Sequence, residues 1–408
     1  MKRRVSERVK ELIEQRGLSR RQIAQAINYP SNVFDRWVMG TRPFNLKALI
    51  ATTEYLSLPK DYFLPDYLYD CWHAPKDKLE RITEFLCYTR EENFFRYTME
   101  IVSLALEDGK HLDIFYATGV ILEAKGLQRD AEYFYTLVID NERNRLAEHL
   151  ALSYYRRFMV VRDRDMDHAY EAATKLGEHL RMLPEEVMFE AYTNIMSVFY
   201  VLDKWDHLIK YGEEAKSLMD SYIERHIFLY AKCLNYLGFA YRNTGDFQKA
   251  LNAHRLCGEL PGDIFKIWSE LNSCVVHLQS GQGERVHELI NLMGNHHEEA
   301  YNHLIYVLGY LTSKELYDKI EETLSIFSES IKLLFEKNDP INKKMSVSVR
   351  LMIAKFHLYK GNQTEAARLV KDAFVIVRKL KLNNLIVDCV RLLGMLREGD
   401  IATICSEI

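Results

Sequence analysis

The sequence predicts an all-α chain in which a small helical head precedes a long array of helical repeats. Three observations lead to this prediction. Apolar residues recur at helical spacing along most of the 408 residues, one pattern of small residues recurs every 36 to 41 residues, and five of the eight prolines fall within the first 75 residues. Since proline interrupts helices, the remainder of the chain can form a long helical series.

Residues 1–64 begin with two short helical patterns in close succession. The first runs from Val5 to about Gln15, where a following glycine stops it. The second begins at Ser19, a preferred N-cap residue, and Gln22 three positions later completes a capping-box pattern. The head therefore opens with two helices joined by a tight turn.

A third helical pattern follows the turn "NYP". Pro30 stands where a proline in the first turn is tolerated, and Val33, Phe34 and Trp37 recur on one face that we expect to point inward. Gly40 can end this helix with a left-handed residue. The three patterns together predict a helix-turn-helix.

This head resembles the repressor-like helix-turn-helix family, and roughly 60 residues are covered. The resemblance implies that the third helix lies in the DNA major groove. The sequence departs from the family at Asn28, where glycine is usual, and at Pro30, where a small polar cap is usual. The matching residues are Leu18, Ser19, Ile23, Ala24, Ile27, Val33, Trp37, Gly40 and Arg42.

The charge of the head suits a polyanion. Residues 1–47 carry a balance of +7 within a total of −4, which leaves −11 for the rest of the chain. Asparagine and arginine pair with adenine and guanine edges, so we expect the outward face of the third helix to read bases, through Ser31, Asn32, Asp35 and Arg36. We expect three further arginines to contact phosphates: Arg20, Arg21 and Arg42.

Beyond the head we predict a connector at 65–78, a repeat array at 79–384, and capping or dimerisation helices at 385–408. Each repeat is defined by five positions in the sequence. The first, usually a small residue, is here called the anchor, and the other four lie 3, 7, 12 and 16 positions after it. The two closest copies are Gly119, Leu122, Gly126, Ala131, Tyr135 and Gly238, Tyr241, Gly245, Ala250, His254. Weaker copies have anchors at Arg157, Ser197, Cys274 and Ala354, with a degenerate copy near Leu308.

The array resembles the tetratricopeptide repeat, so the complete fold prediction is a repressor-like helix-turn-helix followed by a tetratricopeptide-type solenoid. A head and array in this order resemble the Rap, Rgg, NprR, PlcR and PrgX superfamily of quorum-sensing regulators. The overall layout and the stretch "YTREENFFRYTMEIVSLALED" are most similar to its arbitrium receptor branch, AimR and its chromosomal relatives.

The resemblance implies a cytoplasmic homodimer with two partners, a duplex DNA operator and a short linear signalling peptide, and no contact with a membrane. Rap members instead inhibit partner proteins. In the superfamily, side-chain amides on the inner helices bind the peptide backbone, which an amide can do as both donor and acceptor. The candidate peptide-binding residues are Tyr116, Tyr154, Arg162, Asn194, Asn235, Arg242, Asn272 and Asn302.

No catalytic residue, cofactor or metal site is expected. Glu299 and His303 lie four positions apart on a helical pattern, but no third ligand is spaced to join them. The seven cysteines form no CxxC pair, so we expect reduced thiols in the core. The charged N-terminus and the lack of an 18-residue apolar run predict a cytoplasmic protein.

Two function classes remain open from the sequence. One is a transcription factor switched by a short peptide, and the other is a DNA-tethered scaffold whose repeats bind a protein. A peptide receptor should have a closed polar groove, whereas a scaffold should expose a broad apolar one. The asparagine, tyrosine and arginine residues at the inward positions favour the peptide receptor.

Overall fold

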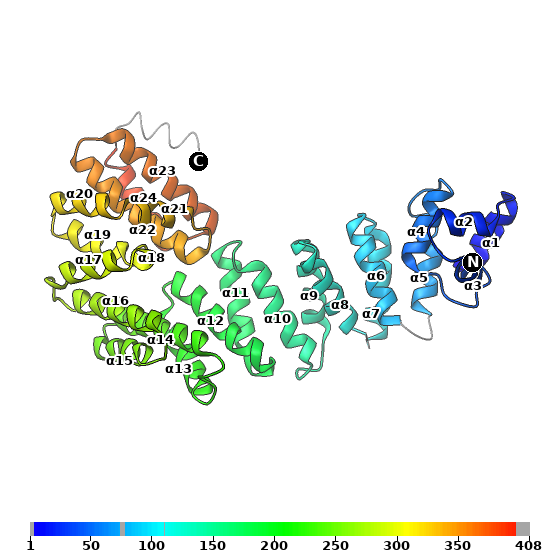
Figure 1. The fold of residues 1–408 in the computed structure, drawn as a ribbon, viewed down its shortest axis with the longest axis horizontal. Helices are drawn as coiled ribbons and strands as arrows, with labels where there is room; N and C mark the ends of the chain where they lie inside the picture. The colour runs from blue at the N-terminus through cyan, green and yellow to red at the C-terminus, as the bar shows by residue number, and fades with distance from the viewer. Residues whose placement is uncertain (1–3, 74–77, 110, 397–408) are drawn as a thin grey trace. The chain divides into compact units, whose positions relative to one another are not determined.

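A computed structural model describes residues 4–73, 78–109 and 111–396 of the chain. Within these ranges it contains 24 α-helices and one short 3₁₀ turn and no β-strand, which confirms the all-α prediction (Figure 1). None of the helices described is long and apolar enough to cross a membrane. The chain divides into two compact units, Met1–Arg157 and Phe158–Ile408.

The first unit begins with the four helices of the head. Asn28 and Gly40 both adopt left-handed backbone conformations, with φ of 61° and 71°, so asparagine takes the place of the usual glycine in the turn between α2 and α3. Ser19 is the N-cap of α2, but its side chain makes no capping hydrogen bond. The helices are α1 (Val5–Gln15), α2 (Arg20–Ala26), α3 (Ser31–Val38) and α4 (Leu46–Tyr55).

The inward face of α3 differs from the prediction in one position. Phe34 and Trp37 are buried as expected, and their rings pack on each other edge to face at 6.4 Å. Val33 is only half-buried, and Val38 is buried instead. Val38 lies four positions after Phe34, so the buried face of the helix continues into its last turn.

Helix α5 (Leu64–Trp72) occupies most of the segment predicted as a connector. It packs against α1, α6 and α7, so the head and the first array helices belong to one unit. Asp66 accepts a 2.6 Å hydrogen bond from Arg8, and Asp70 accepts one of 3.1 Å from the backbone N–H of Val5. The first unit continues through α6 (Lys78–Glu91), α7 (Phe95–Asp108), α8 (Asp113–Ala124), α9 (Gln128–Asn141) and the greater part of α10 (Glu148–Val161), whose last residues belong to the second unit.

The second unit is a series of antiparallel helix pairs. It comprises α11 (Met166–Gly177), α12 (Glu185–Val201), α13 (Trp205–Met219), α14 (Ile227–Asn243), α15 (Phe247–Gly258), α16 (Asp263–Gln279), α17 (Arg285–Asn295), α18 (His297–Ala300), α19 (Leu304–Ser313), α20 (Tyr317–Ile326), α21 (Ser328–Glu336), α22 (Pro340–Tyr359), α23 (Gln363–Leu380) and α24 (Asn383–Leu393), with a 3₁₀ turn at Leu180–Met182.

The predicted spacing within a repeat corresponds to real contacts. A Cβ placed on the anchor Gly119 would lie 2.5 Å from the Tyr135 ring, and one on Gly238 would lie 2.3 Å from the His254 ring, in each case 16 positions later. Only glycine therefore allows these rings to pack against the anchor helix. Seven positions after Gly238, Gly245 adopts φ 86° and ends the first helix of the pair.

The register of one predicted copy was wrong by one residue. In the copy with its anchor at Ser197, the position seven residues later, where the first helix should end, is Lys204. The left-handed residue that ends this helix is instead Asp203, with φ 55°. The anchor of this copy is therefore Met196. The same turn geometry reveals a repeat that the sequence reading missed: Asn93, seven positions after Leu86, has φ 60° and joins α6 to α7.

The last helices of the second unit return to its beginning. Helix α22 contacts α12, and the ammonium of Lys344 donates to Asp203 Oδ1 over 2.6 Å and to the backbone oxygen of Tyr200 over 3.1 Å. The other oxygen of Asp203 accepts a hydrogen bond from Asn384 on α24. We call this set of contacts the Asp203 junction.

Helix α24 packs on α22 and α23, with Cys389 and Leu392 buried, while Val387 and Val390 are exposed. The rest of the predicted capping or dimerisation segment, residues 397–408, lies outside the described residues.

Weakening the Asp203 junction should loosen α22. Asparagine tolerates the left-handed conformation, so Asp203→Asn preserves the backbone while removing the charge that compensates Lys344. We expect the opening free energy of α22 to fall by about 2–3 kcal/mol, and its amide exchange to accelerate roughly 30- to 150-fold. Hydrogen exchange followed by mass spectrometry on the full chain measures this. The control is Glu321→Gln, which breaks the exposed pair with Lys360 and should leave exchange of α22 nearly unchanged.

Candidate functional site

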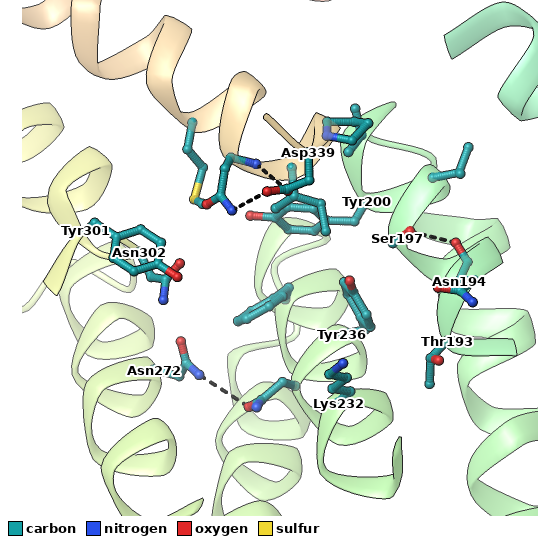
Figure 2. Close-up of a pocket in the computed structure, with 18 of the residues that line it drawn as sticks. Thr193, Asn194, Ser197, Tyr200, Lys232, Tyr236, Asn272, Tyr301, Asn302 and Asp339 are labelled. Atoms are coloured by element: carbon teal, nitrogen blue, oxygen red, sulfur yellow. Dashed lines mark hydrogen bonds between the residues drawn. The ribbon is translucent and has the colours of Figure 1, made fainter. Parts of the chain in front are cut away.

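The second unit contains a cavity of about 520 Å³. Its wall comes from the inner helices α12, α14 and α16, from the segment around α18 and α19, and from the start of α22. Figure 2 shows Thr193 and Asn194 on one side of the cavity, with Tyr301 and Asn302 on the opposite side. Five of the eight predicted peptide-binding residues line it: Arg162, Asn194, Asn235, Asn272 and Asn302.

The other three predicted residues are placed differently. Arg242 belongs to α14 but is 3% exposed and does not line the cavity. Tyr116 and Tyr154 belong to the first unit, where Tyr116 accepts a 3.3 Å hydrogen bond from Arg156. The structure therefore brings together the predicted residues of the second unit only.

The predicted residues Asn194 and Asn235 stand three positions before the predicted anchors Ser197 and Gly238, but the inward position of each repeat lies two residues before the anchor. Counted from the anchors Met196, Gly238, Cys274 and Leu308, this position holds a row of cavity-lining residues in which asparagine and tyrosine alternate: Asn194, Tyr236, Asn272 and Tyr306. Asn235 lies one residue before Tyr236 of this row. Its side chain also lines the cavity and is almost fully buried.

At one side of the cavity, Asn194 is held by a guanidinium. Arg162 Nη1 donates to Asn194 Oδ1 over 2.6 Å, and Arg162 Nε lies 3.3 Å from the carboxylate of Asp163. Ser197 donates to the backbone oxygen of Asn194 over 2.6 Å (Figure 2). The Asn194 amide is thus oriented with its oxygen engaged by the protein.

A second group of polar residues forms a buried chain of contacts. Asn272 Nδ2 donates to Asn235 Oδ1 over 3.2 Å. The same oxygen of Asn235 lies 3.2 Å from His254 Nδ1. At the other end, Asn272 Oδ1 lies 3.2 Å from His303 Nε2, and the Nδ1 of that ring lies 3.3 Å from the backbone oxygen of Glu299. Neutral His303 carries one ring proton, so only one of its two contacts is a hydrogen bond at a time.

Both histidines are neutral at physiological pH. Burial, together with the positive charge of Arg242, lowers the pKa of His254 to about 3 and that of His303 to about 4. Arg242 donates to the Tyr306 hydroxyl over 2.7 Å and lies over the Tyr306 ring at 4.6 Å. Among the described residues, no carboxylate lies within ion-pairing distance of this guanidinium.

The aromatic part of the wall was missed by the sequence reading. The Tyr200 ring packs 5.9 Å from Tyr236 and 5.5 Å from Phe239, and Trp268 lies nearby in the lining. Burial raises the pKa of Tyr200 and Tyr236 well above the ordinary value, so both phenols stay protonated. The inward offset of two residues would have identified Tyr236 from the repeat pattern.

Three carboxylates of the wall were also missed, those of Asp163, Glu299 and Asp339. Burial raises the pKa of Glu299, and a 3.0 Å hydrogen bond from Asn302 opposes that rise. Asp339 caps α22 by accepting from the backbone N–H of Asn342 at 3.0 Å (Figure 2). Glu299 is thus bonded to Asn302 while His303 reaches Asn272, so this pair does not face a common metal ion. The cavity combines amides, phenols and carboxylates, which suits binding of a polar extended ligand.

The predicted DNA-binding residues lie on the surface of the head. Asn32, Asp35 and Arg36 on α3 are exposed, and Ser31 at its start is half-buried. Arg21 and Arg42 are exposed, and Arg20 is half-buried with its guanidinium 3.4 Å from Met39 Sδ. These side chains are free to meet a nucleic acid.

Comparison with protein-family models gives no match for this chain, and comparison with curated proteins gives no similar sequence.

Two buried neutral histidines should make the second unit sensitive to mild acid. Below the ordinary pKa of 6.5 the unfolded chain takes up a proton at each, whereas the folded chain does so only near pH 4 for His303 and pH 3 for His254. The free energy of unfolding should therefore fall as the pH drops from about 6.5 toward 4, by up to about 1.4 kcal/mol per pH unit for each histidine.

Urea unfolding between about pH 7 and pH 5 measures this dependence. His254→Leu should make it shallower than in the wild type. His207, a half-buried ring that lies outside the cavity, provides the control, and His207→Leu should keep the wild-type slope. Equal slopes for the wild type and His254→Leu would contradict the prediction.

Proposed function

We propose that this protein is a transcriptional regulator whose affinity for a DNA operator is controlled by a short peptide bound in the second unit. The observation that carries the proposal is the cavity in which asparagine and tyrosine alternate along successive inner helices. An extended peptide backbone offers an N–H and a C=O at each residue, and asparagine can pair with both. The exposed basic face of the head supports the DNA-binding half of the proposal.

The size of the cavity favours a short ligand over a protein partner. Its volume of about 520 Å³ lies within the range of sites that enclose small ligands, on the order of 300–1,000 Å³. A scaffold that binds whole proteins would instead be expected to use a broad apolar surface. The tetratricopeptide classification, the homodimer and the membership in the quorum-sensing superfamily are part of the same proposal.

Peptide binding should depend on the cavity amides. A random library of peptides of about five to ten residues, selected on the full chain, identifies a binding sequence whose affinity calorimetry then measures. Asn194→Ala and Asn235→Ala should each cost about 1–3 kcal/mol of binding, because each removes an amide from the polar wall. Asn252→Ala, an exposed asparagine on α15, is the matched control and should bind like the wild type.

DNA binding without peptide should be unaffected in all three variants. Peptide should change the affinity for DNA by a factor of about 5–150, and DNA should change the affinity for peptide by the same factor. If the wild type selected no peptide from the library, the scaffold function would be favoured instead.

The head should read DNA through α3. On a duplex selected from random sequences, Arg36→Ala should weaken binding by about 1–3 kcal/mol and relax the base preference. Arg20→Ala should weaken binding to all sequences alike and flatten the dependence on salt. Fluorescence anisotropy over a range of salt concentrations separates the two effects. Arg129→Ala on α9 is the exposed control outside the head, and wild-type behaviour of both head variants would exclude α3 as the reading helix.

A further inference from the structure

The amide of Asn272 contacts Asn235 through its nitrogen and His303 through its oxygen, and His254 in turn contacts Asn235. The Asn272 nitrogen donates to Asn235 Oδ1 over 3.2 Å, and His254 Nδ1 lies 3.2 Å from that same oxygen. Asn272 and Asn235 line the cavity, whereas His254 is fully buried behind them. Figure 2 shows Asn272 on the cavity wall with this hydrogen bond dashed. His254 therefore reaches the amides of the cavity wall through Asn235.

The side-chain oxygen of Asn235 has little bonding capacity left for a ligand. It accepts a hydrogen bond from Asn272 Nδ2 and also faces His254 Nδ1. Asn272 keeps one N–H, because an amide nitrogen carries two and only one is used. That N–H is the donor a ligand can reach.

The repeat geometry agrees with this division of roles. Asn272 stands two residues before its anchor, in the same row as Asn194, Tyr236 and Tyr306, which all line the cavity. Asn235 stands one residue out of that row, toward the second helix of its own repeat. Its amide therefore meets His254, the residue 16 positions after the anchor, rather than the centre of the cavity.

The His254 ring is fixed by close packing. A Cβ on Gly238 would lie 2.3 Å from His254 Cε1. The His254 ring therefore occupies the space that the side chain of any residue other than glycine at position 238 would fill. The Phe239 ring packs against it at 5.8 Å. Position 238 is helical with a negative φ, so its glycine serves this close approach rather than a turn.

The surroundings of the two ring nitrogens of His254 indicate which of them carries the proton. His254 Nδ1 faces an acceptor, whereas Nε2 is buried without a partner. A buried N–H without a partner is rarer and more costly than a buried acceptor without one. The proton therefore belongs on Nδ1, from which it can be donated to Asn235.

We propose that His254 and Asn235 are positioning residues: His254 donates from Nδ1 to Asn235, and Asn235 orients the amide of Asn272 so that its free N–H meets a carbonyl oxygen of the bound peptide. This inference rests on the proposed peptide-binding function. It assigns direct contact to Asn272 and an indirect role to the other two residues.

Leucine and asparagine at position 254 provide a matched pair of variants. Their side chains share the same branched outline, and both lack the outer ring atoms of histidine, but only asparagine places a nitrogen donor where Nδ1 stands. His254→Leu should raise the dissociation constant of the library-selected peptide about tenfold or more, and His254→Asn should stay within about threefold of the wild type. Equal affinities for the two variants would overturn the proposal. Thermal unfolding of both variants shows whether the pair is equally folded.

A double-variant cycle tests whether the effect passes through Asn272. In an Asn272→Ala background, His254→Leu should cause no further loss of peptide affinity, because the amide on which it acts is absent. A loss as large as in the wild-type background would overturn the indirect role. His207→Leu, outside the cavity, should bind peptide like the wild type.

Nitrogen NMR of the ligand-free full chain, labelled with ¹⁵N in its histidines, tests the arrangement without any peptide. The His254 signals are identified by their loss in His254→Asn. We expect a protonated Nδ1 and an unprotonated Nε2 at neutral pH, the opposite of the tautomer that prevails in water. A protonated Nε2 would leave Nδ1 without a proton, so that Nδ1 and Asn235 Oδ1 would be two facing acceptors without a hydrogen bond, and this would overturn the proposal.

These outcomes separate the inference from the function on which it rests. If the wild type binds no library peptide, the proposed function fails and the inference fails with it. If the wild type binds peptide and His254→Leu binds it equally well, only the inference fails.

Discussion

The structure of the second unit depends on the close approach of the two helices within each repeat. Where the anchor is glycine, the ring 16 positions later packs directly on the backbone of the first helix, as His254 does on Gly238. This contact fixes the rotation of α14 about its axis. The rotation of an inner helix in turn decides that the position two residues before the anchor faces the cavity. A side chain at Gly238 would separate α14 from α15 and turn the α14 part of the cavity row away from its centre.

The polar wall that results is buried, so its groups must find partners. An unpaired amide inside a protein costs roughly 1–3 kcal/mol. The cavity meets this requirement with bonds among its own residues, from Arg162 to Asn194 and from Asn272 to Asn235. The side chains are thereby oriented before any ligand arrives, which reduces the entropy lost on binding. Arg242, which lies outside the wall, is buried with a hydroxyl partner, and none of the carboxylates in the described part of the chain is within ion-pairing distance of it.

In each unit, polar contacts of carboxylates join an early helix to helices that come later in the sequence. In the first unit, two carboxylates of α5 bind Arg8 and the N-terminus of α1, so the head is packed against the helices that follow it. In the second unit, Asp203 receives Lys344 and Asn384, which joins α12 to the last helices and closes the wall of the cavity. Both arrangements use partly buried charges at element ends, where a single residue can engage two partners.

The sequence by itself determined the helical class, the head helices and most of the repeats, because these depend on local periodicity, capping residues and glycines at turns. It also named five residues of the cavity wall, since asparagines stand out at regular offsets. Tertiary structure decided the rest. The offset of the inward face, the register at Asp203, and the partners of Arg242 and Asn235 depend on how helices rotate and pack. Residues as far apart in sequence as Asp203 and Lys344 meet only when the whole unit has folded, so no local pattern could pair them.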